Sequence, residues 1–358
     1  MIKMPWSIKW LLLIMLVSCS SEVRKKIEQS PPKEETTVDS NLKTFEGQEN
    51  IVLLLLPLTG NKKTLGESIL NTCVLAASEM RNINFFALDI ADPSIEKSQI
   101  YDFRNKKPKM VIGPIFSRDT KQFGAIFSNV PILTFSNNSE VNSDHVFACG
   151  ISPQDEIRTL LDYARIQGNC NFLAILPEGE LGDQLIEIMK KELEKNNDGE
   201  NLEILRYSSI STNDATEYAR NSGRKIVFVV DPIVKISELN EVFTLNSVAL
   251  SNADAWNGVI FAFVDNPEQR EFIQKYYSVF GKNPSILDMI GYDIMNVAKQ
   301  SIESRVSSIE GDYNGSLGAF SVKKKEGLRR DLKVFRLENG QKIELSSKIN
   351  IENDKIDE

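Results

Sequence analysis

The fold of this chain is decided by residues 51–80, which read IVLLLLPLTGNKKTLGESILNTCVLAASEM. The six aliphatic residues that precede Pro57 are too few for a useful helix and suit a strand buried on both faces. After the turn, apolar residues recur at three- and four-residue spacing, which predicts the apolar stripe of a helix. A strand, a turn and a helix form the first half of a βαβ unit. Ligands of such sheets bind beyond the carboxyl ends of the strands, which here means residues 57–60.

The remainder of the chain alternates short apolar segments with amphipathic ones. Predicted strands cover residues 51–56, 84–90, 110–113, 131–135, 145–150, 172–176, 202–207, 225–230 and 258–264. Predicted helices between them include residues 93–105, 117–127, 181–195 and 267–280, together with one that starts at Pro153. This alternation predicts an α/β fold with a doubly wound, mostly parallel sheet, and 358 residues favour two hinged lobes. Ser117 and Ser152 are expected to cap helices, and Gly281 is expected to end one.

The expected domain plan has five parts. Residues 1–18 are a signal peptide, residues 19–49 a lipidated cysteine with a disordered tether, and residues 347–358 a charged tail. Lobe 1 covers residues 50–148 and is completed by about 258–325. Lobe 2 covers residues 149–257 and is completed by about 326–346. The chain is expected to cross between the lobes near Gly150, Trp256 and Tyr313.

The amino terminus predicts a membrane anchor. Lys3 and Lys9 flank the start of an apolar run, and Leu16-Val17-Ser18-Cys19 resembles the lipobox of bacterial lipoproteins, in which Cys19 becomes the acylated first residue. An ordinary signal peptide with an incidental cysteine is the alternative. Ser20 permits sorting to the outer membrane, whereas an Asp at that position commonly retains a lipoprotein at the inner one.

Charge and motif content exclude several classes of function. The chain carries 42 Lys and Arg against 50 Asp and Glu, a net charge of −8 without a strongly basic block, so nucleic acid is not an expected partner. His145 is the only histidine and stands where a strand should start, which indicates a structural role. No nucleotide-binding loop, nucleophile elbow or Cys-x-x-Cys pair occurs. We therefore expect a protein that is not an enzyme and that holds neither a cofactor nor a metal.

Three cysteines follow Cys19. Cys73 lies on the predicted apolar stripe, where a cysteine acts as a small hydrophobic residue. We do not expect a disulfide between Cys149 and Cys170, although nothing in the sequence fixes the distance between them.

Candidate ligand-binding residues follow the ends of the lobe 1 strands. They are Thr59, Gly60, Ser117, Ser136, Asn137, Asn138 and Ser139. Because the carboxyl ends of parallel strands meet at one edge, we expect these residues to converge on the cleft between the lobes. The hydroxyl of Ser117 and nearby backbone N–H groups would hold a carboxylate. The alternative is that Ser117 only caps its helix and that residues 136–139 form an ordinary polar turn.

Three stretches resemble the type I periplasmic-binding fold of the leucine-binding-protein superfamily. They are PLTG followed by LGESILNTCVLAASE, VIGPIFSRDTKQ, and WNGVIFAFVDNPEQREFIQKYYSVFGKNP with GYDIMNVA after it. The resemblance spans about residues 50–341. In the amino-acid receptors of this family, the hydroxyl equivalent to that of Ser117 and the loop after the fourth strand hold the ligand. A tyrosine often closes over the ligand where this chain has Leu181, and Asp231 or Asp265 would be the acidic partner of a ligand ammonium group.

Within this superfamily the chain looks most like the penicillin-binding protein activator lipoproteins of alphaproteobacteria, which share the PLTG and IGPIFS segments and a lipobox. The resemblance implies a lipoprotein at the outer membrane that faces the periplasm and regulates a peptidoglycan synthase. The alternative is a lipid-anchored substrate receptor of an ABC importer, which would dock a permease and bind an amino acid or another small polar solute in the cleft. Leu181 and Ser20 favour the regulator.

Overall fold

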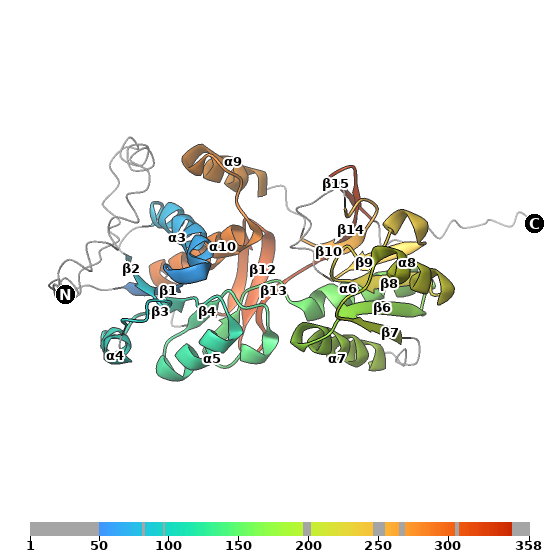
Figure 1. Ribbon diagram of the computed structural model, residues 1–358. Helices are drawn as coiled ribbons and strands as arrows, with labels where there is room; N and C mark the ends of the chain where they lie inside the picture. Colours follow the sequence, from blue (N-terminus) through green and yellow to red (C-terminus); the bar gives the residue numbers. More distant parts are fainter. Residues whose placement is uncertain are drawn as a thin grey trace, which may run out of the picture. The chain divides into compact units, whose positions relative to one another are not determined.

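The computed structural model describes residues 50–80, 83–95, 97–195, 202–245, 255–264, 269–304 and 308–345. The chain divides into two units, each built from two separate stretches of sequence (Figure 1). Unit 1 extends to Gly150 and takes in Asn266–Arg330, and unit 2 takes in Ile151–Asp265 and the chain from Asp331 onward. Residues 1–49 and 347–358, for which the sequence predicts a signal peptide, a lipidated Cys19, a tether and a charged tail, lie outside the described residues. No helix in these ranges is long and apolar enough to cross a membrane.

Unit 1 is built on a parallel five-stranded sheet in the order β2-β1-β3-β4-β5. Its strands are β1 (Ile51–Leu56), β2 (Asn84–Asp89), β3 (Met110–Ile112), β4 (Ile132–Thr134) and β5 (Val146–Ala148). The segments that connect them contain η2 (Gly60–Lys62), α3 (Lys63–Ala77), α4 (Lys97–Asn105), α5 (Ser117–Ile126) and η3 (Ser139–Val141). The sequence predicts all five strands, and β1 agrees to the residue.

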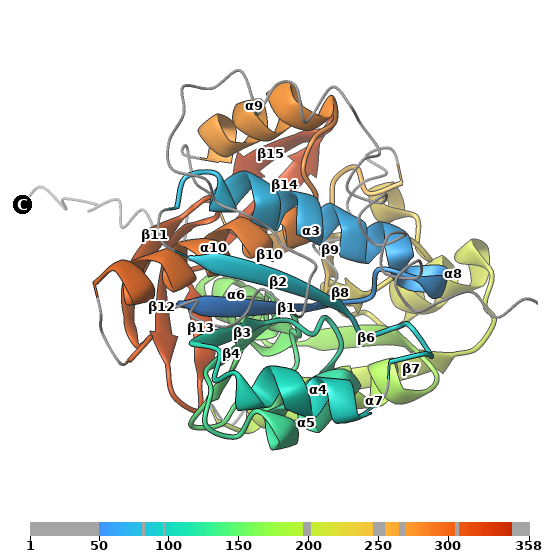
Figure 2. The ribbon, with the colours of Figure 1, turned by 90° about the vertical axis from the view of Figure 1, so that its left-hand side faces the viewer.

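Helices cover both faces of this sheet, which explains why every residue of β1 is apolar and buried. Leu53 and Leu55 point to the face covered by α4 and α5, where they pack with Phe103 and Phe127. The helix α3 lies over the opposite face together with α10 (Ile286–Glu303) (Figure 2).

The second stretch of unit 1 adds helices and a small sheet. Its remaining elements are α9 (Gln269–Phe280), β11 (Gly311–Gly315), β12 (Gly318–Lys323) and β13 (Gly327–Arg330), the three strands forming an antiparallel sheet. Ser285 and Asp288 form a capping box at the start of α10. Gly281 ends α9 as the sequence predicts. Phe272 and Tyr276 lie on the buried side of α9, whereas Tyr277 is 55% exposed.

Unit 2 is built on a seven-stranded sheet in the order β15-β14-β10-β9-β8-β6-β7. Its strands are β6 (Phe172–Pro177), β7 (Leu202–Tyr207), β8 (Ile226–Val229), β9 (Glu241–Thr244), β10 (Ile260–Phe263), β14 (Lys333–Glu338) and β15 (Gln341–Glu344). Its helices are α6 (Pro153–Ile166), α7 (Glu180–Glu194), α8 (Thr212–Asn221) and η5 (Ile236–Glu238). Pairing is parallel from β7 to β10 and antiparallel from β10 to β15.

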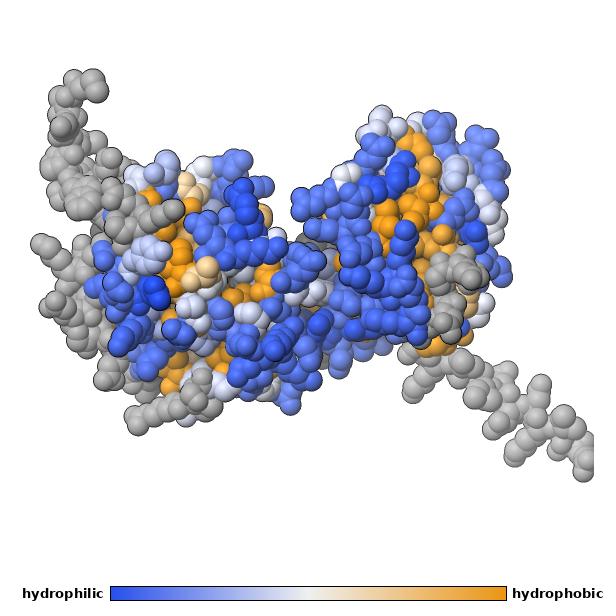
Figure 3. Space-filling view, turned by 90° about the horizontal axis from the view of Figure 1, so that it is seen from below, coloured by the Kyte–Doolittle hydropathy of each residue, from blue (hydrophilic) through white to orange (hydrophobic). Residues whose placement is uncertain are grey.

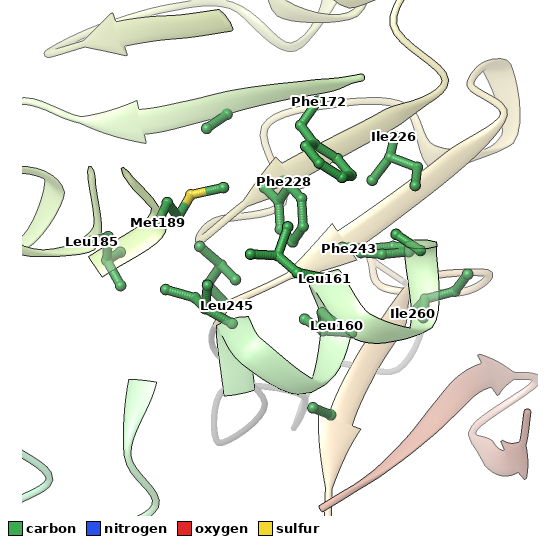
Figure 4. Packing of buried hydrophobic residues seen from close by; sticks show 14 of the residues in the cluster. Leu160, Leu161, Phe172, Leu185, Met189, Ile226, Phe228, Phe243, Leu245 and Ile260 are labelled. Carbon is green, nitrogen blue, oxygen red and sulfur yellow. The ribbon is translucent and has the colours of Figure 1, made fainter. Parts of the chain in front are cut away.

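One core of unit 2 lies between this sheet and the helices α6 and α7 (Figure 4). The rings of Phe172 and Phe243 each meet the ring of Phe228 edge-on, with centroids 5.8 and 5.2 Å apart. Leu160 and Leu161 of α6 are fully buried in this core. Ser152 stands at the N-cap of α6 as expected, although its side chain makes no capping hydrogen bond.

The chain crosses between the units after Gly150, Asp265 and Arg330. The first crossing lies where the sequence predicts it. The expectations near Trp256 and Tyr313 are wrong, and residues 258–264, assigned to lobe 1 from the sequence, belong to unit 2. The reason is the pairing of β10, which lies between β9 and β14 inside the sheet of unit 2.

Hydrophilic side chains cover most of the face seen in Figure 3, and apolar side chains reach it in each unit. The large apolar residues exposed in the described ranges are Tyr101, Phe116, Ile166, Leu181, Tyr218, Tyr277 and Ile343. Phe116 and Leu181 follow strands whose carboxyl ends are the expected position for ligands.

Candidate functional site

The candidate site is the edge of unit 1 where its parallel strands end. β1, β3 and β4 are neighbours in the sheet and run in the same direction. The loops that follow these strands therefore leave the same edge side by side. These loops and the first residues of the helices after them hold all seven residues predicted to bind a ligand, at residues 59–60, 117 and 136–139.

The loop after β1 presents Thr59 and Gly60. Thr59 has an extended backbone and precedes η2, and its side-chain oxygen is buried without a hydrogen-bond partner among the described residues. Gly60 is exposed and has a φ of +69°, a left-handed conformation that favours glycine. Lys62 then lies over the ring of Phe116, 5.8 Å from its centroid, and so links this loop to the loop after β3.

The loop after β3 leads directly into α5. Ser117 is the first residue of this helix and Phe116 is the N-cap, without a side-chain capping bond. The prediction that Ser117 caps the helix is therefore wrong. Thr120 connects the start of α5 to β4. Its hydroxyl donates to the carbonyl of Phe116 at 2.9 Å and forms a hydrogen bond of 2.7 Å with the hydroxyl of Thr134.

The loop after β4 uses some of its polar groups on itself. The hydroxyl of Ser136 accepts a hydrogen bond from the backbone N–H of Asn138 at 3.1 Å, and the Asn138 side chain accepts one from Glu140 N–H at 2.9 Å. Asn137 and Ser139 show no side-chain hydrogen bond within the described ranges. Ser136 and Asn138 thus shape the loop, whereas the side chains of Asn137 and Ser139 remain available to a ligand.

Sequence reasoning missed Asp89, which lies at the carboxyl end of β2 and is 2% exposed. One carboxylate oxygen accepts hydrogen bonds from the backbone N–H groups of Leu58 at 2.7 Å and Ala91 at 3.0 Å. The other oxygen is buried and has no partner among the described residues. Asp89 therefore holds the loop of Thr59 in place. Its position at a strand end, just before a turn, was the signal available in the sequence.

The residues proposed for lobe 2 are Leu181, Asp231 and Asp265. Leu181 lies in the first turn of α7 and is 51% exposed. Asp231 accepts a hydrogen bond of 2.6 Å from the hydroxyl of Tyr207. Burial, together with this bond to Asp231, raises the pKa of Tyr207 above its usual range. Asp265 lies outside the described residues.

The other groups with reactive side chains are His145 and three cysteines. His145 contacts the hydroxyl of Ser143 at 3.3 Å and the carbonyl of Gly124 at 3.1 Å, as expected for a residue that positions a strand. Cys73, Cys149 and Cys170 are all free. Burial raises the pKa of Cys73 and of Cys149 to about 12, so neither thiol forms a nucleophile at neutral pH. No group of three or more His, Cys, Asp or Glu in the described ranges could hold a metal ion.

Comparison with known proteins bears on the fold. No family model matches the chain. An uncharacterized protein of Rickettsia prowazekii is 22% identical over 156 residues, and this match spans 42% of each chain.

Three solved structures resemble the chain more extensively. A putative branched-chain amino acid ABC transporter protein from Rhodospirillum rubrum has a TM-score of 0.65 at 16% identity, over 82% of this chain and 99% of the other. A leucine-binding protein from Thermotoga maritima has a TM-score of 0.58 at 16% identity, over 83% of this chain and 97% of the other. The C-domain of LpoA from Haemophilus influenzae, described as a regulator of PBP1A, has a TM-score of 0.61 at 18% identity, over 83% of this chain and 100% of that domain.

The chain covers only 60% of full-length LpoA from the same organism. The solved structures it resembles include solute-binding and regulatory proteins. TM-scores of 0.58 to 0.65 over more than four fifths of the chain establish the architecture. The chain has the type I periplasmic-binding-protein fold.

Proposed function

We propose that the protein is a non-enzymatic regulator of peptidoglycan synthesis that faces the periplasm. One observation carries this proposal: of the groups of unit 2 expected to hold an amino acid, the lid tyrosine is replaced by Leu181, and Asp231 already accepts a hydrogen bond. Leu181 stands where related receptors often have a tyrosine, and Asp231 is bound by Tyr207. The bond from Tyr207 occupies one of the acceptor positions of this carboxylate. The regulator needs neither group, because its function is to contact a protein.

The similarity to LpoA supports the same proposal. It covers the entire C-domain of that protein, which is described as a regulator of PBP1A. The partner proposed for this chain is accordingly a peptidoglycan synthase of its own cell.

The proposal includes a lipid anchor at Cys19 in the outer membrane. It is motivated by the sequence Leu16-Val17-Ser18-Cys19, by Ser20, and by the polar composition of residues 20–49. Several acyl chains on one cysteine anchor a protein stably, and a flexible linker of this composition sets its reach without adding contacts. Such a linker would allow the two units to meet a synthase held in the opposite membrane.

A second candidate function is that of a solute receptor for an ABC importer. It is favoured by the edge of unit 1, where Thr59, Ser117, Asn137 and Ser139 carry polar side chains that are not engaged within the described residues. These hydroxyl and amide groups could bind a small polar solute. The similarity to the Rhodospirillum rubrum transporter protein is compatible with this candidate.

Crosslinking in the native cell separates the two candidates. The full lipoprotein, tagged at its carboxyl terminus, is crosslinked and recovered from separated inner and outer membranes. The regulator is expected in the outer-membrane fraction and joined to a peptidoglycan synthase. Recovery with ABC permease subunits and without a synthase would overturn it in favour of the receptor.

Ligand screening provides an independent measurement. A solute that binds only the folded protein stabilises it by about 2.7 kcal/mol at a concentration of 100 times Kd. For the regulator we expect no shift in melting temperature with any of the twenty amino acids. A clear shift, or an amino acid retained through purification, would support the receptor.

A further inference from the structure

Arg330 is the last residue of unit 1 before the chain crosses into unit 2. Its side chain is 4% exposed, although the strand that carries it lies at the rim of the small sheet. One terminal nitrogen donates to the carboxylate of Asp293 at 2.8 Å, and the other donates to the backbone carbonyl of Cys149 at 3.2 Å. The guanidinium also lies over the ring of Phe320, 5.2 Å from its centroid. A planar fork of donors suits such a double contact, whereas a lysine offers a single point of charge.

The contact with Cys149 joins two crossing segments of the chain. Cys149 directly precedes Gly150, after which the chain makes its first crossing, and Arg330 precedes the third crossing. The two residues are 181 positions apart in sequence and are connected by one hydrogen bond. Both segments are therefore held together within unit 1 immediately before they leave it.

Asp293 fixes this junction to the body of unit 1. It lies in α10, is fully buried, and also accepts hydrogen bonds from the backbone N–H and hydroxyl of Ser316 at 2.5 and 2.9 Å. A Cβ atom at Gly315 would lie 2.3 Å from an oxygen of Asp293, so the chain can approach this carboxylate only with glycine there. The carboxylate is thus held from several sides and cannot follow Arg330 if the crossing segments move.

The same junction reaches the candidate site. The backbone N–H of Gly150 donates to the carbonyl of Ser136 at 3.0 Å. A Cβ atom at Gly150 would lie 2.9 Å from the Cα of Asn137, so the crossing segment packs directly on the loop after β4. A molecule bound by that loop would act on the first crossing through Gly150.

We propose that Arg330 is the anchor of the hinge. It holds the first and third crossing segments at a fixed separation on unit 1, so that unit 2 moves about both segments together and not about each one independently. Asp293 is the fixed support of this anchor, and Gly150 couples it to residues 136–139. The anchor is a positioning device, and it would serve a regulator and a receptor equally. Its test is therefore independent of the proposed function.

The experiment measures the distance between the units in the full mature chain. Spin labels are attached to Lys121→Cys on α5 and Glu217→Cys on α8, both exposed positions, in a chain with Cys19→Ser and Cys170→Ser. The thiols of Cys73 and Cys149 remain unlabelled because both are buried, at 1% and 0% exposure. Double electron–electron resonance then gives the distribution of distances between the two spin labels. It is measured for the reference chain, for Arg330→Met, for Arg330→Lys and for the neighbouring control Arg329→Met.

We expect a broader distance distribution for Arg330→Met, a partial broadening for Arg330→Lys, and no change for Arg329→Met. Hydrogen exchange at the amide of Gly150 should accelerate about tenfold or more in Arg330→Met, because a charge-assisted bond beside it is lost. A folded Arg330→Met with an unchanged distribution and unchanged exchange would overturn the proposal, since a merely stabilising residue would lower only the melting temperature. If Arg330→Met does not fold, Arg330→Lys decides by the same two readouts.

Discussion

The carbonyl oxygen of Pro57 occupies the space that a side chain at Gly66 would need. A Cβ atom on Gly66 would lie 2.0 Å from that oxygen, and unit 2 repeats the relationship with 1.9 Å between Gly182 and the carbonyl oxygen of Pro177. The two units thus share one arrangement. Strand β1 ends just before Pro57 and β6 ends at Pro177, and the helix that follows each strand, α3 or α7, places a glycine against the carbonyl of that proline. In unit 1 this close approach positions α3, the helix that follows the loop of Thr59. A substitution at Gly66 therefore tests it directly.

Gly66→Ala should destabilise unit 1 by about 1–3 kcal/mol, because the added methyl group forces the helix away from backbone that cannot yield. The matched control is Gly291→Ala, which is also a buried helical position, and whose Cβ would meet its nearest neighbours at an ordinary 3.5 Å. The control should be neutral or more stable by up to about 1 kcal/mol, since alanine restricts the unfolded chain. Urea unfolding compares the two, and equal midpoints would contradict the prediction.

Asp293→Ala should cost about 3–5 kcal/mol, because it leaves the buried guanidinium of Arg330 without its counter-charge. The control removes a carboxylate from the surface: Glu187 pairs with Lys191 on α7, and both side chains are 64% exposed. Glu187→Ala should change stability by at most about 0.5 kcal/mol. Comparable losses of unfolding free energy in the two variants would show that the Asp293–Arg330 pair is not sheltered from water.

Ser117→Ala should leave the free energy of unfolding within about 0.5 kcal/mol of the reference, because Ser117 does not cap α5. Asn138→Ala should cost about 1 kcal/mol, because the Asn138 side chain accepts the N–H of Glu140 at the start of η3. If a charged solute is found to bind, Ser117→Ala should weaken its affinity about ten- to a hundredfold. Unfolding curves and binding titrations check both parts, and an unaltered affinity would remove Ser117 from the site.

The stability of the protein should fall as the pH rises from 9 towards 12. Burial raises the pKa of Cys149 from an ordinary 9.0 to about 12, and this effect outweighs the opposing charge of Arg330. The pKa of Cys73 is also raised to about 12, mainly by burial and to a smaller extent by the negative charge of Asp288. The unfolded chain therefore loses these protons first. The stabilisation is complete below pH 9 and is lost as the pH approaches the folded pKa.

The matched measurement compares the reference with Cys149→Ala between pH 8 and 11. The variant should be less stable at pH 8, because it leaves a small cavity, and its unfolding free energy should fall less steeply with pH. Parallel pH dependences would mean that the thiol of Cys149 is already ionised or accessible in the folded protein.

Cys19 should incorporate labelled palmitate in a bacterial host, and Cys19→Ser should not. The prediction follows from Leu16-Val17-Ser18-Cys19 after an apolar run. Cys170→Ser is the control, since it removes a cysteine that lies in unit 2, far along the chain from the predicted signal peptide, and should incorporate the label normally. Equal labelling of the reference and Cys19→Ser would remove the anchor from the proposed function.

The sequence by itself determined the elements and their class. The run of apolar residues in β1 predicts a strand with the observed ends, and so does LEILRY for β7. Residue hydrophobicity and turn chemistry act locally. A buried strand, or the end of a helix at Gly281, can therefore be predicted from the local sequence alone. The sequence also identified the loops after β1, β3 and β4, because parallel strands must end at a common edge.

Only the tertiary structure decided which distant segments meet. It assigned β10 to unit 2 by pairing it with β9 and β14, and it brought Arg330 against Asp293 and Cys149. It also showed that Tyr207 engages Asp231 and that Phe116, not Ser117, is the N-cap of α5. A local pattern reports whether a residue is buried, but not its partner, because many distant partners satisfy the same pattern. The choice among them depends on the packing of the complete chain.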